Sequence, residues 1–218
     1  MPSRSLNRIL WGIALLAIVF FGFKARDTLD AIFIGVGTLD VRADPSEDTV
    51  YLTWRGRIAA PMEARLREAF ARYNSARTFV LALASPGGSI DQGARVVALL
   101  RQIRETHQLE TVVEAGKPCA SMCVPVYLQG TRRTAAASAR FMFHEVSFRE
   151  EVSNDEVNVP ESAKSSETDR LFARFFVPAG VSQTWIDKVR AEMTGGNDIW
   201  LTGRELVDQD SGVVQSVF

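Results

Sequence analysis

The sequence has few of the side chains that bind metals, and this scarcity limits the chemistry open to it. Its 218 residues include two cysteines and two histidines. Structural zinc is typically held by about four cysteine or histidine ligands. Cys119 and Cys123 are close in sequence, but neither His107 nor His144 falls at ligand spacing from them or from the other histidine. We therefore expect no metal and no other cofactor.

The chain also lacks an excess of charge of either sign. Its 25 Lys and Arg against 26 Asp and Glu give a net charge of −1, and no block of like charges occurs. Proteins that bind a phosphate backbone usually carry a basic patch. We therefore expect no nucleic-acid partner. The apolar share of 46% is typical of a folded globular domain.

One long apolar run is present, from Ile9 to Phe23, with basic residues on both sides. A helix of that length reaches about 22 Å, short of a hydrocarbon core of roughly 30 Å, but flanking basic side chains can snorkel outward. No small-residue cleavage pattern occurs at 21–25, which favours an uncleaved anchor over residues 1–26; a cleaved export signal is the alternative. We expect a single-pass protein of a bacterial inner membrane with its body in the periplasm, where disulfides can form.

The remainder divides into a linker and one domain. Residues 27–47 are interpreted as the linker, although Ala31–Val41 could contribute a strand, and 48–218 form the domain. Strand and helix patterns alternate along it, which predicts an α/β fold with a mainly parallel sheet. The polar, acidic stretch 147–166 is expected to be an exposed excursion. Strands are predicted at 49–54, 79–84, 111–113 and 141–143, and helices at 61–74, 90–103, 121–128, 167–177 and 182–193.

Several residues between and after these strands could carry chemistry together. Ser85-Pro-Gly-Gly88 follows a buried strand, Ser121 lies between the two cysteines, and His144 follows another apolar strand. A serine nucleophile needs a base, an orienting acid and backbone N–H donors for the oxyanion. Each residue also has a structural interpretation: Ser121 as a helix cap, His144 as a core histidine, and the cysteines as packing residues or, if Cys119 precedes the first helical turn, a disulfide.

The order of these motifs resembles the proteolytic subunit of the Clp protease. The similar segments are Ser85–Ser89, Cys119–Met122 and Arg140–His144, and Asp198–Leu206 is similar to the segment that begins with the family's catalytic aspartate. The resemblance covers about Thr49 to the end of the chain. The flanking cysteines and the N-terminal apolar run depart from the cytosolic enzyme and look more like predicted periplasmic or membrane-anchored relatives.

The resemblance implies a ClpP/crotonase-type fold of stacked ββα units, here preceded by one transmembrane helix. It also implies the roles of the site residues and a peptide or unfolded-protein substrate. The implied roles are Ser121 as nucleophile, His144 as general base, Asp198 as orienting acid, Gly88 and Met122 as oxyanion donors, and Gly87 and Ser89 as substrate-binding residues.

Alternatives remain open at this point. Asp198 could instead cap the following helix, and Asp208 or Asp210 could take its place. A serine–lysine dyad with Lys117 is disfavoured because that side chain should point away, and acyl-CoA chemistry of the crotonase kind would not need a serine–histidine pair. We expect a membrane-anchored serine endopeptidase, with an inactive peptide-binding relative as the alternative. In the Clp family, the segment after the catalytic histidine joins two rings. The stretch 147–166 occupies that place but does not resemble it, so we do not expect stacked double rings, and a smaller homo-oligomer remains open.

Overall fold

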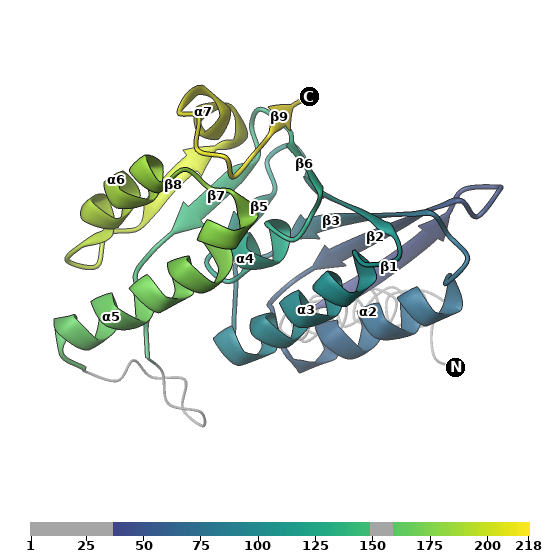
Figure 1. Ribbon diagram of the computed structural model, residues 1–218, viewed down its shortest axis with the longest axis horizontal. Helices are drawn as coiled ribbons and strands as arrows, with labels where there is room; N and C mark the ends of the chain where they lie inside the picture. Colours follow the sequence, from purple (N-terminus) through teal and green to yellow (C-terminus); the bar gives the residue numbers. More distant parts are fainter. Residues whose placement is uncertain (1–36, 149–158) are drawn as a thin grey trace, which may run out of the picture.

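Two β-sheets organise the computed structural model, which describes residues 37–148 and 159–218 (Figure 1). The larger sheet has six strands in the order β1-β2-β3-β4-β6-β9, and the smaller has three in the order β5-β7-β8. In the larger sheet only β1 is antiparallel to its neighbour. Strand β7 runs parallel to β5 and antiparallel to β8. The predicted α/β fold with a mainly parallel sheet is confirmed.

From β2 to β4, strands and helices alternate along the chain, and after β4 their order is less regular. The strands are β1 (Thr38–Ala43), β2 (Thr49–Arg55), β3 (Thr78–Ala84), β4 (Gln108–Val113), β5 (Pro118–Ala120), β6 (Arg132–Ala135), β7 (Arg140–Phe143), β8 (Ile199–Thr202) and β9 (Ser216–Val217). The helices are α2 (Ala60–Arg72), α3 (Ile90–Ile103), α4 (Cys123–Tyr127), α5 (Glu161–Leu171), α6 (Gln183–Met193) and α7 (Gly203–Asp208), with a π-helical turn η1 (Phe172–Phe176) and a 3₁₀ turn η2 (Val177–Ala179).

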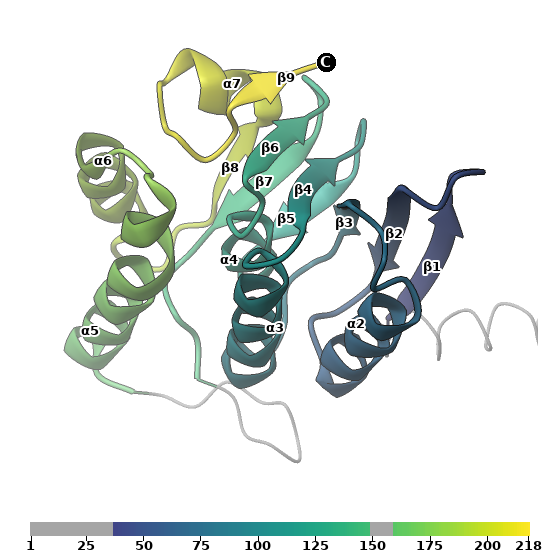
Figure 2. The same cartoon turned by 45° about the vertical axis from the view of Figure 1, so that its right-hand side comes forward.

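Helices α2 and α3 cover one face of the larger sheet (Figure 2). Each helix has an apolar stripe at helical spacing, and α2 buries Met62, Leu66 and Phe70 as expected. Helix α3 begins after Ser89, whose hydroxyl accepts a hydrogen bond from the Gln92 N–H at 3.3 Å. Ser89 therefore satisfies one of the N–H groups that lack a partner in the first helical turn.

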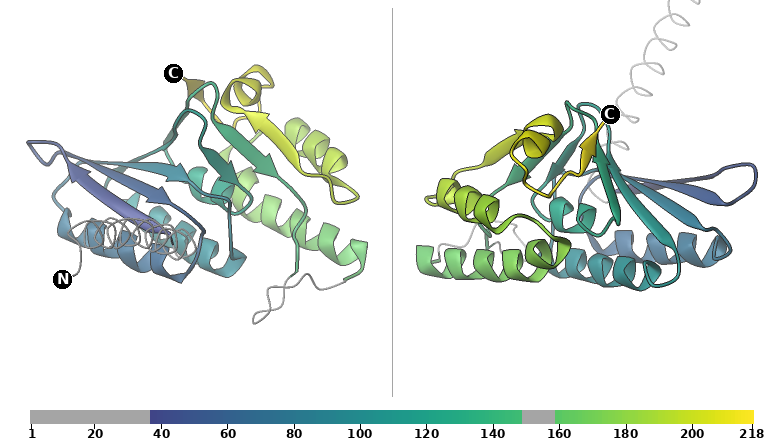
Figure 3. Two further views of the ribbon diagram at one scale, coloured as in Figure 1. Left: turned by 180° about the vertical axis from the view of Figure 1, so that it is seen from behind. Right: turned by 45° about the horizontal axis from the view of Figure 1, so that its top comes forward.

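The turn η1, which directly follows α5, and helix α6 pack beside the smaller sheet through an aromatic cluster (Figure 3). The ring of Phe143, on β7, lies edge-on to Trp185 at 5.1 Å and to Phe176 at 6.3 Å, measured between ring centroids. Phe172 stacks on Phe176 at 4.1 Å. All four side chains are buried. Because Phe143 is held from two sides, the backbone of the next residue, His144, is fixed as well.

Strand β1 extends the sheet beyond the expected domain start. It pairs with β2 from Thr38 opposite Arg55 to Ala43 opposite Val50, so the sheet begins at Thr38 and not at residue 48. A strand within Ala31–Val41 was possible from the sequence, and β1 overlaps that stretch, but its antiparallel partner is a tertiary contact that local composition does not reveal. The expected anchor, residues 1–26, lies outside the described residues. Within 37–148 and 159–218, no helix is both long and apolar enough to cross a membrane.

A capping box begins α7 and supplies a stability prediction. The Thr202 hydroxyl accepts from the Glu205 N–H at 3.2 Å, and the Glu205 carboxylate accepts from the Thr202 N–H at 2.7 Å. The Thr202 hydroxyl also donates to the Glu205 carboxylate at 2.8 Å, and the hydrogen bonds from the Thr202 N–H and hydroxyl lower the pKa of Glu205. The T202A variant should lose about 1 kcal/mol of unfolding free energy at pH 7.

Urea denaturation of the variant and the wild type at two pH values checks this prediction. A lowered pKa means that the carboxylate stabilises the fold above its unfolded pKa of about 4.3, and that this contribution is lost as the pH falls. The difference between wild type and T202A should therefore shrink at pH 3. Equal unfolding free energies at pH 7 would contradict the capping role.

Candidate active site

Parallel chain segments bring the predicted site residues to one edge of the fold. Strands β5 and β7 are parallel, with Ala120 opposite Met142 at the end of the register. Ser85, directly after β3, forms a parallel bridge with Cys119. The carboxyl ends of parallel strands lie at the same edge of a sheet. The residues that follow them therefore meet there, namely the glycine turn, Ser121 and His144.

Ser121 occupies a sharp turn between β5 and α4. Its φ of 52° is in the left-handed region, which costs a residue with a side chain about 1–2 kcal/mol. Its N–H donates to the Met142 carbonyl at 2.9 Å, and its own carbonyl accepts from the Val124 N–H at 2.9 Å. The helix predicted at 121–128 begins only at Cys123, because a left-handed residue cannot be part of it. Strand–turn–helix elbows of this kind present the serine of many hydrolases.

The structure brings Ser121 and His144 into direct contact. His144 Nε2 lies 2.8 Å from Ser121 Oγ, and both residues are partly buried. This distance is within the range in which an imidazole can take the proton of a hydroxyl. The pair is 23 residues apart in sequence, and the parallel pairing of β5 with β7 joins it.

The glycine turn leaves a backbone N–H directed towards the site. The Ile58 N–H donates to the Gly87 carbonyl at 2.8 Å, and the Ser89 N–H donates to the Ile58 carbonyl at 3.0 Å. Because alternate backbone groups of an extended segment point to opposite sides, the N–H of Gly88 faces away from Ile58. Among the described residues, neither the Gly88 N–H nor the Met122 N–H donates a hydrogen bond. Two unengaged N–H groups beside a serine can bind a developing oxyanion.

Ser85 holds the glycine turn and was not predicted as a site residue. Its buried hydroxyl accepts from the Gly87 N–H at 3.1 Å. Its backbone N–H donates to the Pro118 carbonyl at 2.8 Å, and its carbonyl accepts from the Ala120 N–H at 3.0 Å. Ser85 thus ties the turn to β5. The available signal was its place as the first residue of the Ser-Pro-Gly-Gly motif.

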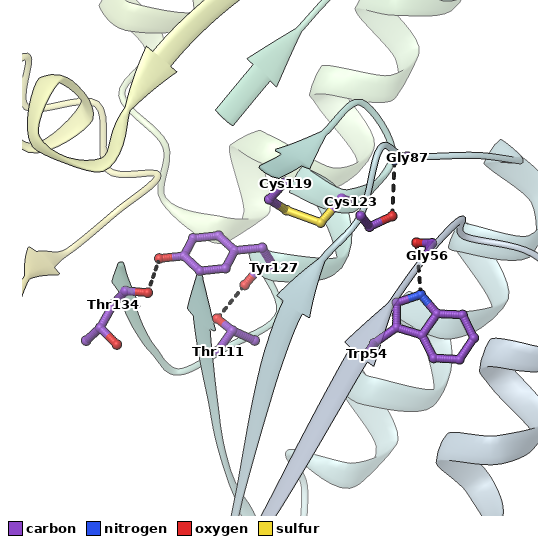
Figure 4. Close-up of a disulfide and its surroundings, with 9 residues drawn as sticks. Trp54, Gly56, Gly87, Thr111, Cys119, Cys123, Tyr127 and Thr134 are labelled. Atoms are coloured by element: carbon purple, nitrogen blue, oxygen red, sulfur yellow. Dashed lines mark hydrogen bonds between the residues drawn. A yellow bond between two sulfur atoms is a disulfide. The ribbon is translucent and has the colours of Figure 1, made fainter. Parts of the chain in front are cut away.

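A disulfide joins Cys119 and Cys123 beside Gly87 (Figure 4). Cys119 belongs to β5 and precedes the first turn of α4. This is the arrangement under which a disulfide was expected to be possible. Both residues are fully buried. Across 37–148 and 159–218, no group of three or more His, Cys, Asp or Glu side chains is placed to hold a metal ion.

Asp198 borders the same cavity as the serine and the histidine. This cavity, of about 640 Å³, is lined by both of them and also by Lys164. Asp198 is exposed, directly before β8, and Thr202 instead of Asp198 caps α7. Asp208 and Asp210, at the far end of α7, do not line this cavity, and neither does Lys117. Of the three candidate acids, Asp198 is the one that lines this cavity.

A smaller apolar cavity of about 60 Å³ opens beside Ser121. Both Gly88 and Met122 border it, so it lies next to the two unengaged N–H groups. The side chains that give it an apolar wall come from α3, β7 and its following loop, α5 and η1. They are Ile90, Phe143, Val146, Leu171, Phe172 and Phe176.

Glu145 is a buried carboxylate directly after His144. Its side chain is 4% exposed, and its Oε1 lies 3.7 Å from Arg190 Nη1. Arg190 also binds Asp169 at 2.6 Å. Burial raises the pKa of Glu145, Glu161 raises it further, and Arg190 opposes the rise. The sequence did not indicate this cluster because its members come from separate elements.

Replacing Glu145 by glutamine should stabilise the protein at pH 8. A raised pKa means that folding penalises the charged form of Glu145. The wild-type fold is therefore most stable below the unfolded pKa of about 4.3, and its unfolding free energy falls as the pH rises. The advantage of E145Q should therefore be present at pH 8 and vanish near pH 4. Urea denaturation at both values measures it, and a variant that is less stable at pH 8 would show that the Arg190 pair dominates.

The elbow, the serine–histidine contact and the unengaged amides together define a serine hydrolase site. The family model described as Clp protease matches residues 68–218. The chain therefore belongs to the Clp protease family and is a serine-type peptidase. No curated protein matches the sequence.

Solved structures share the fold at low sequence identity. An asparagine-to-aspartate mutant of ClpP1 from Listeria monocytogenes is 19% identical, covers 79% of this chain and 92% of its own, and has a TM-score of 0.57. A serine-to-alanine mutant of the 1510-N membrane-bound stomatin-specific protease is 14% identical, covers 77% of each chain and has a TM-score of 0.57. A lysine-to-alanine mutant of that protease in complex with a substrate peptide is 15% identical, covers 77% and 73%, and has a TM-score of 0.58.

Proposed function

We propose that the protein is a membrane-anchored serine endopeptidase that cleaves extended peptides or unfolded protein segments with Ser121, His144 and Asp198. The observation that carries the proposal is the 2.8 Å contact between Ser121 Oγ and His144 Nε2. It lies at the mouth of an apolar cavity and beside two unengaged N–H groups.

The mechanism uses these groups in turn. Ser121 Oγ attacks the scissile carbonyl while His144 Nε2 takes its proton. The N–H groups of Gly88 and Met122 bind the oxyanion, and His144 returns the proton to the leaving amine. Water then attacks the acyl-enzyme with His144 again as base. Asp198, on the wall of the same cavity, has the role of holding the imidazole in its productive tautomer.

A peptide substrate fits the geometry around Gly88. The N–H of Gly88 faces away from Ile58, so an extended peptide can pair with this side of the segment as an added strand. Ser89, at the end of the turn, lines the larger cavity that such a peptide would cross. The apolar cavity can take one apolar side chain of the substrate. The 1510-N protease bound to a substrate peptide has a related fold and supports this substrate class.

Digestion of a disordered test protein by the purified full chain tests the proposal. Mass spectrometry of the products should show internal cuts that follow apolar residues and are absent with S121A. The alternative is an inactive relative that binds peptides without cutting them. Folded wild-type protein that binds the test protein and yields no new ends would favour that alternative.

The anchor and the oligomeric state belong to the same proposal. The apolar run Ile9–Phe23 supports attachment to a membrane with the domain outside the cytoplasm, and the Cys119–Cys123 disulfide suits an oxidising compartment. The full chain should sediment with membranes and resist carbonate extraction, whereas a chain starting at residue 37 should not. Light scattering of the detergent-solubilised chain would show whether a homo-oligomer forms.

A further inference from the structure

The disulfide spans the part of the chain that holds the nucleophile. Cys119 belongs to β5 and Cys123 is the first residue of α4. The residues enclosed between them include Ser121 and Met122, which supply the nucleophile and one oxyanion donor in the proposed mechanism. Figure 4 draws the bond, and a Cβ at Gly87 would lie 2.7 Å from Ser121 Cβ, so the glycine turn lies against the enclosed segment. No other covalent link joins the described elements.

Hydrogen bonds hold the helix side of this elbow only weakly. In a regular helix the N–H of the residue at position 125 would donate to the Ser121 carbonyl. Residue 125 is proline, which has no N–H. The Ser121 carbonyl is instead bonded to the Val124 N–H alone, at 2.9 Å. Helix α4 itself is only five residues long, so it adds little rigidity of its own.

Ser121 nevertheless has to keep an unfavourable backbone conformation. Its φ of 52° would relax if the two ends of the turn could separate. The Cα atoms of Cys119 and Cys123 are held 5.2 Å apart by the bond. A shift of Ser121 by about 1 Å is enough to cost roughly 100-fold in rate when reacting atoms must be aligned.

We infer that Cys119 and Cys123 are positioning residues for the reaction, acting through Ser121. Their disulfide keeps the elbow closed, with Oγ at His144 and the Met122 N–H in the oxyanion site. Because both cysteines are fully buried, dissolved thiols do not reach the sulfur atoms in the folded protein, and the bond acts as a permanent clamp. This inference rests on the proposed function.

The test is the kinetics of labelling by a fluorophosphonate probe, with the full chain in detergent. The double variant C119A/C123A should label with a maximal rate constant at least about 10-fold lower than the wild type, and with an unchanged half-saturating probe concentration. Leu66→Ala, a buried change on α2 away from the site, is the control. It should lower the melting temperature at least as much and label at the wild-type rate.

A second measurement avoids mutation. Wild-type chain produced with reduced cysteines should label slowly. The same chain unfolded and refolded with oxidised glutathione, which takes up two electrons and two protons as the disulfide forms, should label at the full rate. Equal rates for the wild type, the double variant and the reduced chain would overturn the inference and leave the proposed function standing. Folded, oxidised wild type that does not label would overturn both.

Discussion

Replacing Ser121 by alanine should lower kcat for peptide cleavage by roughly 10⁶-fold, as loss of a catalytic serine does in subtilisin. His144→Ala should cost about as much, because among the described residues His144 is the base in contact with Ser121 Oγ, at 2.8 Å. The double variant should be no worse than either single one, since the two side chains act as a unit. Neither change should affect folding, because both side chains are at the cavity surface.

His107→Ala is the matched control for the histidine change. It removes the only other histidine of the chain, which lies directly before β4 with Nε2 donating to the Asn74 carbonyl at 3.1 Å. Its ring packs 5.2 Å from that of Phe79, measured between centroids. H107A should keep the wild-type kcat. A large loss in H107A, or residual activity in S121A above a hundredth of the wild-type rate, would contradict the assignment.

Replacing Gly87 by alanine should lower kcat by about 10³-fold, comparable to the loss of an oxyanion donor. A Cβ at this position would lie 2.7 Å from the Ala120 carbonyl oxygen and 2.7 Å from Ser121 Cβ. Real contacts are not that short, so the turn or the elbow must move. Either shift separates the Gly88 N–H from the nucleophile. The measurement is kcat against KM for a fluorogenic peptide, with the loss expected in kcat.

Gly116→Ala is the matched control for the glycine change. Gly116 also has a positive φ, 66° against 92° for Gly87, but a Cβ there meets nothing within 4 Å. The control therefore carries the same kind of backbone strain, about 1–2 kcal/mol, without displacing the site. G116A should be less stable and retain its kcat. Equal losses of kcat in the two variants would show that strain alone explains the result for Gly87.

The elements that position the site were predictable where the pattern is local. Strand β3 is a continuous apolar run followed by the glycine turn, and α2 and α3 have clear apolar stripes. The strand before His144 was predicted from its apolar run, but the pairing of Ser121 with His144 was expected only from the resemblance to the family. Asp198 was predicted as a site residue only from its similarity to the family segment. An exposed aspartate before a short strand has no periodic pattern that would indicate its position.

The remaining features depend on contacts between distant segments. Strand β5 spans three residues, too few for an alternation pattern, and β1 joins the sheet only through its antiparallel partner. The disulfide could not be decided from the sequence because it depends on where α4 begins. That start is set by the left-handed backbone of Ser121, whose N–H is bonded to Met142 of the neighbouring strand.

Activation of Ser121 by His144 can be tested by locating the residue that a fluorophosphonate modifies. The folded full chain is treated with the probe and digested, and the modified peptide is identified by mass spectrometry. We expect a single adduct on Ser121 that disappears in H144A and persists in H107A. A folded wild-type chain with no adduct, or with its adduct on another serine, would contradict the claim that His144 activates Ser121.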